Sequence, residues 1–251
     1  MVANMSQIQL LAARIGGRRA AGLGLGLVLL AVAALAPSAG RADPSIQRAG
    51  TDSLGSADAV ARRLAAWRAL LQEGRSLGER AKLERVNRFF NRLRFVADGQ
   101  PGSGPDHWDT PREFLARDGG DCEDFALAKY FTLRALGVPR QRLSLTDVRA
   151  LRPQGAGRAA QAHMVLTYRP AGPSGPGGRA LVLDNLRADI LPLSRRADLL
   201  PVYSFNGAGL WLASRDGSGR RVGSAQRLSR WRELLGRMRR QASPVAVPSA
   251  Y

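Results

Sequence analysis

One run of ten residues decides both the fold and the site: Gly119-Gly120-Asp121-Cys122-Glu123-Asp124-Phe125-Ala126-Leu127-Ala128. It holds the only cysteine of the chain. The two glycines leave the backbone free to turn tightly. The apolar run 125–136, closed by Gly137 and Pro139, predicts a helix. Cys122 is therefore predicted at a helix N-terminus, where unpaired N–H groups and the helix dipole favour a thiolate.

Length and charge bound the class of protein. Residues 1–40 of the 251 predict a secretory signal peptide, because basic residues precede an apolar stretch at 20–35 and small residues follow it. An uncleaved N-terminal anchor is the alternative. The net charge of +18 favours an acidic partner or an anionic surface, although the arginine usage of a GC-rich genome also explains it. The signal peptide and the lack of an aromatic-studded basic stripe argue against nucleic acid.

A single cysteine excludes an internal disulfide. We expect a periplasmic protein with no stable membrane insertion once the signal is removed. A free thiol kept in an oxidising compartment needs a reason, and catalysis is one.

The order of elements predicts an α+β domain over residues 56–240, between a flexible linker at 41–55 and a disordered tail at 241–251. Helices are predicted at 56–74, 77–93 and 225–239, and a capping pattern of Thr110, Pro111 and Glu113 starts a short one. Trp108, just before it, either packs in the core or lines the cleft. Period-two segments predict strands at 143–148, 163–168, 180–184, 202–206 and 210–214, with a mobile loop at 149–160 and a turn at 170–178.

Two of these strands carry a candidate base and its partner. If Tyr168 pairs near position 179 or 180, His163 lies opposite Asp184 on the same face of a hairpin. The carboxylate could then accept the Nδ1–H of His163, which leaves the other nitrogen to take a proton from Cys122. Each residue alone has an ordinary structural role as the alternative: a small buried thiol, a core histidine, a strand-ending turn. The other histidine, His107, has no comparable partner in the sequence and is expected to be exposed.

Three acids, Asp121, Glu123 and Asp124, surround the candidate nucleophile. Acids in the first turn of a helix are favoured by its dipole, which is the structural explanation. Like charges around a thiol should nevertheless raise its pKa and weaken it. A bound Ca²⁺, which takes oxygen ligands, would neutralise them, although the spacing is not that of an EF-hand loop. A transition-metal site is not expected from one cysteine and two scattered histidines.

Several of these segments resemble one known family, the bacterial transglutaminase-like cysteine proteinases. The resemblance covers about 57–212 and rests on Trp108-x-Thr110-Pro111-x-Glu113-Phe114-Leu115, the run 119–126, Ala162-His163-Met164-Val165-Leu166, Leu183-Asp184-Asn185 and Pro201-Val202-Tyr203-Ser204-Phe205-Asn206. It implies a papain/transglutaminase-like fold, in which N-terminal helices and a central nucleophile helix pack on an antiparallel sheet. It also implies Cys122 as nucleophile, His163 as base and Asp184 as orienting acid.

The same resemblance implies calcium bound by Asp121 and Glu123, with Asp124 nearby. The implied substrate is the N-terminal region of a large RTX-type surface adhesin, cut after a di-alanine, so that the protease controls biofilm attachment. The implied inhibitor is the periplasmic domain of an inner-membrane cyclic-di-GMP receptor. The sequence thus predicts a calcium-dependent cysteine endopeptidase. A transglutaminase or amidase with the same triad, and a non-catalytic binding module, are the alternatives.

Overall fold

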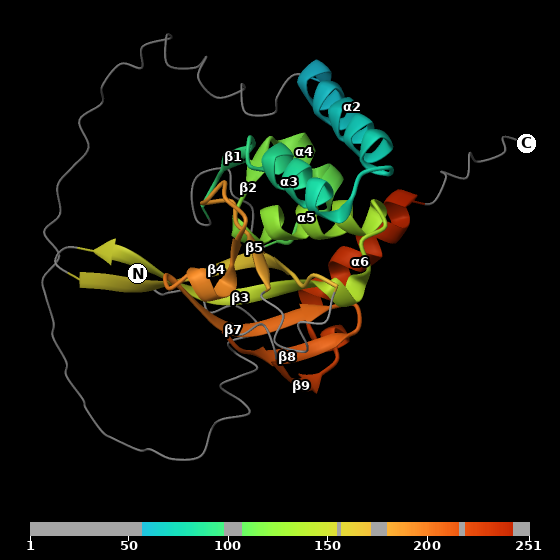
Figure 1. Cartoon of the computed structure of the whole chain (residues 1–251). Helices are drawn as coiled ribbons and strands as arrows, with labels where there is room; N and C mark the ends of the chain where they lie inside the picture. The colour runs from blue at the N-terminus through green and yellow to red at the C-terminus, as the bar shows by residue number, and fades with distance from the viewer. Residues whose placement is uncertain (1–56, 98–106, 155–156, 172–179, 216–218, 243–251) are drawn as a thin grey trace, which may run out of the picture. The chain divides into compact units, whose positions relative to one another are not determined.

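A seven-stranded antiparallel sheet, in the order β6-β5-β4-β3-β7-β8-β9, forms the base of the fold (Figure 1). The computed structural model describes residues 57–97, 107–154, 157–171, 180–215 and 219–242. Its strands are β3 (Leu143–Gln154), β4 (Gly157–Tyr168), β5 (Leu181–Leu183), β6 (Leu191–Pro192), β7 (Leu199–Asn206), β8 (Gly209–Ala213) and β9 (Gly219–Gly223). A separate parallel pair joins β1 (Arg94–Phe95) to β2 (Gly119–Gly120). The predicted signal peptide, the linker and residues 243–251 of the predicted tail lie outside the described residues.

The helices of the described part are α2 (Ala57–Gly74), α3 (Glu79–Phe90), α4 (Pro111–Arg117), α5 (Cys122–Ala135) and α6 (Ser229–Ala242). Short 3₁₀ turns lie at Arg140–Arg142, Leu193–Arg195 and Ala225–Arg227. Among the described residues, no helix is long and apolar enough to cross a membrane. Helices beside an antiparallel sheet confirm the predicted α+β class.

Helix α5 is the centre of the core. It packs on β4, on α3 and on α4, and apolar side chains such as Phe125, Leu127 and Leu133 are buried around it. Phe125 meets the ring of Phe114 edge-on at 4.8 Å between centroids. Burial on more than one side explains why the apolar run of α5 is nearly continuous instead of amphipathic.

Trp108 packs in the core, which is one of the two roles that the sequence predicted for it. It is 4% exposed, and its ring stacks on Phe205 at 5.6 Å between centroids. Trp231 of α6 meets Phe205 edge-on at the same distance, which fastens the C-terminal helix to the sheet. Such aromatic contacts add stability beyond the area they bury.

The prediction of a mobile loop at 149–160 is wrong. β3 and β4 pair without interruption from Leu143↔Tyr168 to Gln154↔Gly157, so both strands run on through it. Figure 1 shows their joined ends reaching past the other strands. The segment is rich in Ala, Arg and Gly and lacks alternating apolar residues, because its side chains there are largely exposed. The helix predicted at 77–93 is shorter, and ends at Phe90.

Candidate active site

The start of α5 places Cys122 at the first helical position. Asp121 is the N-cap, and its side chain accepts the backbone N–H of Asp124 at 3.4 Å. Glycine is required just before it, because a Cβ at Gly119 would lie 2.2 Å from a backbone oxygen of β1 and one at Gly120 would lie 2.2 Å from the Asp124 carboxylate. The tight turn predicted at Gly119-Gly120 is wrong: the two glycines form the short strand β2, and their lack of side chains leaves room for β1 and for the Asp124 carboxylate.

The thiol of Cys122 is half-buried, and it donates a hydrogen bond to Glu123 Oε2 at 3.1 Å. Burial raises its pKa, and the negative charges of Glu123 and Asp121 raise it further, whereas the backbone N–H of Met164 acts on the sulfur and lowers it. The acids thus oppose the helix dipole, as the sequence predicted, and the thiol is held in its neutral form.

His163 and Asp184 form the predicted pair. His163 lies in β4 with 6% of its surface exposed, and its Nε2 is 2.9 Å from Asp184 Oδ1. The predicted nitrogen is wrong: Nε2 faces the carboxylate, which leaves Nδ1 for proton transfer. The predicted register is also off by one or two residues, since Tyr168 pairs with Leu181 and not with position 179 or 180. Asp184 follows the end of β5 and reaches His163 diagonally.

Asp184 is held as a carboxylate by a network that the sequence did not reveal. Burial opposes its charge, but the hydrogen bonds with His163, with the Leu186 N–H at 3.0 Å and with Arg196 Nη2 at 2.8 Å together hold its pKa well below the usual range. Arg196 is itself buried, and the same nitrogen bonds Asp198 at 2.7 Å. Arg196 lies in the short connection between the 3₁₀ turn Leu193–Arg195 and β7, where no periodicity marks it.

The structure brings Cys122 and the His163–Asp184 pair to neighbouring positions without a hydrogen bond between Cys122 and His163, both of which are described. Met164, the residue that follows His163, affects the pKa of the Cys122 thiol through its backbone. The thiol proton is directed at Glu123. The predicted nucleophile at the start of α5 therefore lies next to the part of β4 that carries the predicted base.

Asp124 is linked to a second buried acid, Asp109. The Asp124 carboxylate accepts the backbone N–H of Asp109 at 2.8 Å, and the two side chains are almost fully buried. Burial raises the pKa of Asp109 to about 6, with the nearby Arg117 opposing that shift. Burial and the charge of Asp109 raise the pKa of Asp124 well above its ordinary value. Arg117 lies 3.2 Å from Asp109 Oδ2, but this half-exposed guanidinium offsets the cost of burying the two carboxyls only in part.

Potential metal ligands gather at one place among the described residues: oxygen or nitrogen atoms of His107, Asp109 and Glu113 lie within 4.8 Å of one another. No such group is formed by the predicted calcium ligands Asp121, Glu123 and Asp124, so calcium binding by these residues stays a prediction. His107 was expected to have no partner, and this is wrong, since its Nε2 lies 3.7 Å from Asp109 and 4.0 Å from Glu113.

Lys129 is a buried charge that the sequence did not single out. It lies on α5, two turns after Cys122, with no exposed surface and no hydrogen-bond partner for its Nζ among the described residues. Burial lowers its pKa to about 7, and the charge of Asp184 opposes that shift. Lys129 is thus electrostatically coupled to the orienting acid.

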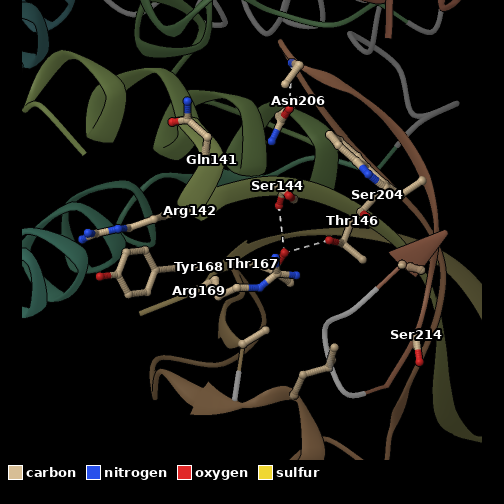
Figure 2. A pocket seen from close by; sticks show the side chains of 16 residues that line it. Gln141, Arg142, Ser144, Thr146, Thr167, Tyr168, Arg169, Ser204, Asn206 and Ser214 are labelled. Carbon is tan, nitrogen blue, oxygen red and sulfur yellow. Dashed lines mark hydrogen bonds between the residues drawn. The ribbon is translucent and has the colours of Figure 1, made fainter. Parts of the chain in front are cut away.

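Two cavities lie on the sheet, and only one contains candidate site residues. The first, of about 300 Å³, is lined by polar side chains of β3, β4 and β7 that include Ser144, Thr146 and Thr167 (Figure 2). There Thr146 and Thr167 share a hydrogen bond of 2.9 Å, and none of the predicted catalytic residues is among the residues that line it. The second, of about 250 Å³, is lined by His163, Asp184 and Arg196 among others. The smaller cavity therefore adjoins the predicted base, His163, and its partner Asp184.

A thiol at a helix start, beside a buried histidine–aspartate pair on an antiparallel sheet, defines a papain-like class of cysteine hydrolase. The family model of the bacterial transglutaminase-like cysteine proteinases matches residues 71–209, more than half of the chain. The chain belongs to this family of cysteine proteases, which confirms the resemblance read from the sequence.

Among solved structures, the chain is similar to Legionella pneumophila LapG, with 41% identity over 71% of this chain and 89% of that one, at a TM-score of 0.59. The calcium-bound form of that protein matches at 41% identity over 72% and 91%, with a TM-score of 0.60. Its EGTA-treated form matches at 41% identity over 71% and 89%, also at 0.60. No curated protein matches the chain.

Proposed function

We propose that the protein is a calcium-dependent cysteine endopeptidase of the periplasm that cuts the N-terminal region of a large surface adhesin and so controls biofilm attachment. The observation that carries the proposal is the hydrogen-bonded His163–Asp184 pair beside the helix start of Cys122. Membership of a cysteine proteinase family supports the reaction class. The calcium-bound structure of Legionella pneumophila LapG, to which the chain is similar, supports the metal.

In this reaction the Cys122 sulfur attacks a peptide carbonyl while His163 Nδ1 takes the thiol proton. His163 then gives the proton to the leaving amine, and water releases the acyl group from sulfur with His163 again acting as base. Asp184 fixes the ring through Nε2 and stabilises the imidazolium. The backbone N–H of Cys122, at the open end of α5, is one donor to the oxyanion.

Calcium would be held by Asp121 and Glu123, with Asp124 near them. The residues fit a hard cation, because all three offer carboxylate oxygens and two of them raise the pKa of the Cys122 thiol by their charge. A bound Ca²⁺ supplies positive charge that offsets these carboxylates and favours the thiolate. Glu123 would then be drawn from the thiol, which frees Cys122 to meet His163.

The proposed partners follow from the family resemblance. The substrate is an RTX-type adhesin, and the inhibitor is the periplasmic domain of an inner-membrane cyclic-di-GMP receptor. The net charge of +18 supports an acidic substrate. Cleavage should accordingly weaken as ionic strength rises, and salt-independent cleavage would contradict an electrostatic contribution.

The proposal is tested by incubating the mature protein with the N-terminal part of a candidate adhesin from the same genome. We expect cleavage with Ca²⁺, its loss in EGTA, and its loss in Cys122→Ala under all conditions. Equal cleavage in EGTA would remove the calcium requirement. Amine incorporation into glutamine without a cut would assign a transglutaminase instead, and unchanged adhesin release by Cys122→Ala in cells would leave only a binding module.

A further inference from the structure

Part of β4 is an open sheet edge. β4 pairs with β3 over its whole length, from Gly157 to Tyr168. On its other side it pairs with β5 only at Leu166, Thr167 and Tyr168. Residues 157–165 therefore have a strand on one side and no described strand on the other. This open edge leads directly to His163.

The backbone groups that face outward along this edge can be assigned. The Arg169 N–H donates to the Arg142 carbonyl at 2.7 Å, which makes these two residues a hydrogen-bonded pair in the β3–β4 ladder. Antiparallel pairs alternate, so every second residue of β4 points its N–H and C=O away from β3. With the observed register, those residues are 158, 160, 162 and 164. Residues 166 and 168, next in the series, use the same groups to pair with β5.

The outward row ends at the nucleophile. Met164 belongs to it, α5 packs on β4, and the Met164 backbone is close enough to Cys122 to lower the pKa of its thiol. Ala162 and Ala160 follow at intervals of two residues, about 7 Å apart along a strand. A chain laid along this row would therefore pass the sulfur in an extended conformation.

The opposite edge of the same hairpin is closed. On β3, the Leu151 N–H is bonded to the Asp198 carbonyl at 2.7 Å, and Pro153 has no N–H to offer. Beyond Arg158 the β4 edge has no charged residue or proline before His163, and Ala160 and Ala162 are exposed and have small, uncharged side chains. Proteins normally block exposed edges with charge or proline, so an unblocked edge on one side only indicates a use.

We infer that an extended segment of the substrate adds to the sheet as a strand along the β4 edge at 158–162, which delivers its scissile carbonyl to Cys122. The inference rests on the proposed function. The outward N–H and C=O groups of Ala160 and Ala162 bond the substrate backbone, and side-chain pockets contribute less. The substrate segment must be unfolded and must lack proline at the paired positions.

The first test is Ala160→Pro, which removes an outward N–H and leaves every β3–β4 hydrogen bond in place. One lost hydrogen bond is worth about 0.5–1.5 kcal/mol, so kcat/KM for the adhesin segment should fall about 2- to 13-fold through a raised KM. Gln161→Ala is the matched control, because it removes an exposed side chain and keeps all backbone groups; it should stay within twofold. Alkylation of Cys122 by iodoacetamide should be equal in all three proteins, which shows an intact site.

The second test uses substrate peptides in which one backbone amide at a time is replaced by an ester. Sensitivity should alternate with a period of two, because only every second N–H faces β4. Uniform insensitivity, with unchanged KM in Ala160→Pro, would overturn strand addition and leave the protease intact. Binding of the same peptides to Cys122→Ala, measured by fluorescence anisotropy, separates the two proposals: alternating binding without any cleavage by the unsubstituted protein would retain the edge and reject the protease.

Discussion

The starts of α4 and α5 are built on the same sequence plan, with very different results. Each has a capping residue followed three positions later by an acid: Thr110 and Glu113 in α4, Asp121 and Asp124 in α5. In α4 the two residues form a complete capping box, and Gln241 also donates to Glu113 at 2.9 Å. In α5 the cap bond is long, at 3.4 Å, and the Asp124 carboxylate also accepts the backbone N–H of Asp109 at 2.8 Å.

The pKa values at the two helix starts also differ: the acid at α4 is stabilised in its charged form, and the acid at α5 is not. Burial opposes the charge of Glu113, but the Thr110 hydrogen bonds and Arg237 outweigh it, and its pKa is lowered. At α5, the pKa values of Asp124 and Cys122 are both raised. The α4 start is arranged for stability. The α5 start keeps carboxyls and a thiol whose charged forms are disfavoured. In the proposed function, a bound cation and the reacting thiol use this arrangement, and function and local stability then conflict there.

The largest contrast should be in catalysis. Cys122→Ala should lower kcat/KM for the adhesin segment by at least about 10³-fold, because no other group can form the acyl intermediate. Thr110→Ala at the other helix start should change it by less than about twofold, since that cap touches no reacting atom. Both are measured by the rate of product appearance on gels. Comparable losses in the two variants would erase the distinction.

Stabilisation by calcium should depend on Asp121 and Glu123 at the start of α5 and not on Glu113 at the start of α4. At a Ca²⁺ concentration of 100 times Kd, the free energy of unfolding should rise by about 2.7 kcal/mol over its value in EGTA. Asp121→Asn and Glu123→Gln should abolish this increase, and Glu113→Gln should retain it. The measurement is thermal or urea unfolding of each protein, once with Ca²⁺ and once with EGTA. If Glu113→Gln alone removed the effect, the metal would belong to the His107–Asp109–Glu113 cluster and the α5 assignment would be wrong.

Lys129 extends the contrast into the body of α5. Its pKa is about 7 in the folded protein and that of an ordinary lysine when unfolded. Between these two values the unfolded state binds more protons, so stability rises with pH over that interval. Relative to Lys129→Met, the unsubstituted protein should gain up to about 1.4 kcal/mol per pH unit between about pH 7 and 10. Parallel urea-unfolding profiles across this range would show that Lys129 titrates normally.

The smallest effect should come from the α4 cap. Thr110→Ala should lower the free energy of unfolding by about 1 kcal/mol, because Glu113 loses the hydroxyl that accepts its backbone N–H. For a domain of this size the midpoint of thermal unfolding should fall by about 2–4 °C. Thr110→Ser, which keeps the acceptor, should unfold near the unsubstituted value. An equal loss in both would indicate that packing of the threonine methyl is responsible.

Local patterns predicted what depends on neighbours in the sequence. The Thr110–Glu113 box and the placement of Cys122 at a helix start are confirmed, since capping is decided within four residues. The pairing of His163 with Asp184 was also predictable, because a hairpin brings its ends together. The ring nitrogen and the strand register were not, since both depend on how Asp184 leaves β5.

The missed features depend on contacts between distant segments. Arg196 bonds Asp184 across an irregular connection, and Asp109 meets Asp124 across fifteen residues. Lys129 looks like an ordinary helix residue until the helices and sheet bury it. The strands through 149–160 were hidden because an exposed hairpin is held by backbone pairing, which side-chain patterns do not record.

The most direct test of the central claim is the rate of Cys122 alkylation by iodoacetamide as a function of pH, with Ca²⁺ present. Cys122 is the only cysteine, so the reaction reports one thiol. We predict rapid alkylation at neutral pH in the unsubstituted protein and a shift of the whole profile to alkaline pH in His163→Ala, because the imidazole holds the thiol proton. Superimposable profiles for the two proteins would contradict a nucleophile activated by His163.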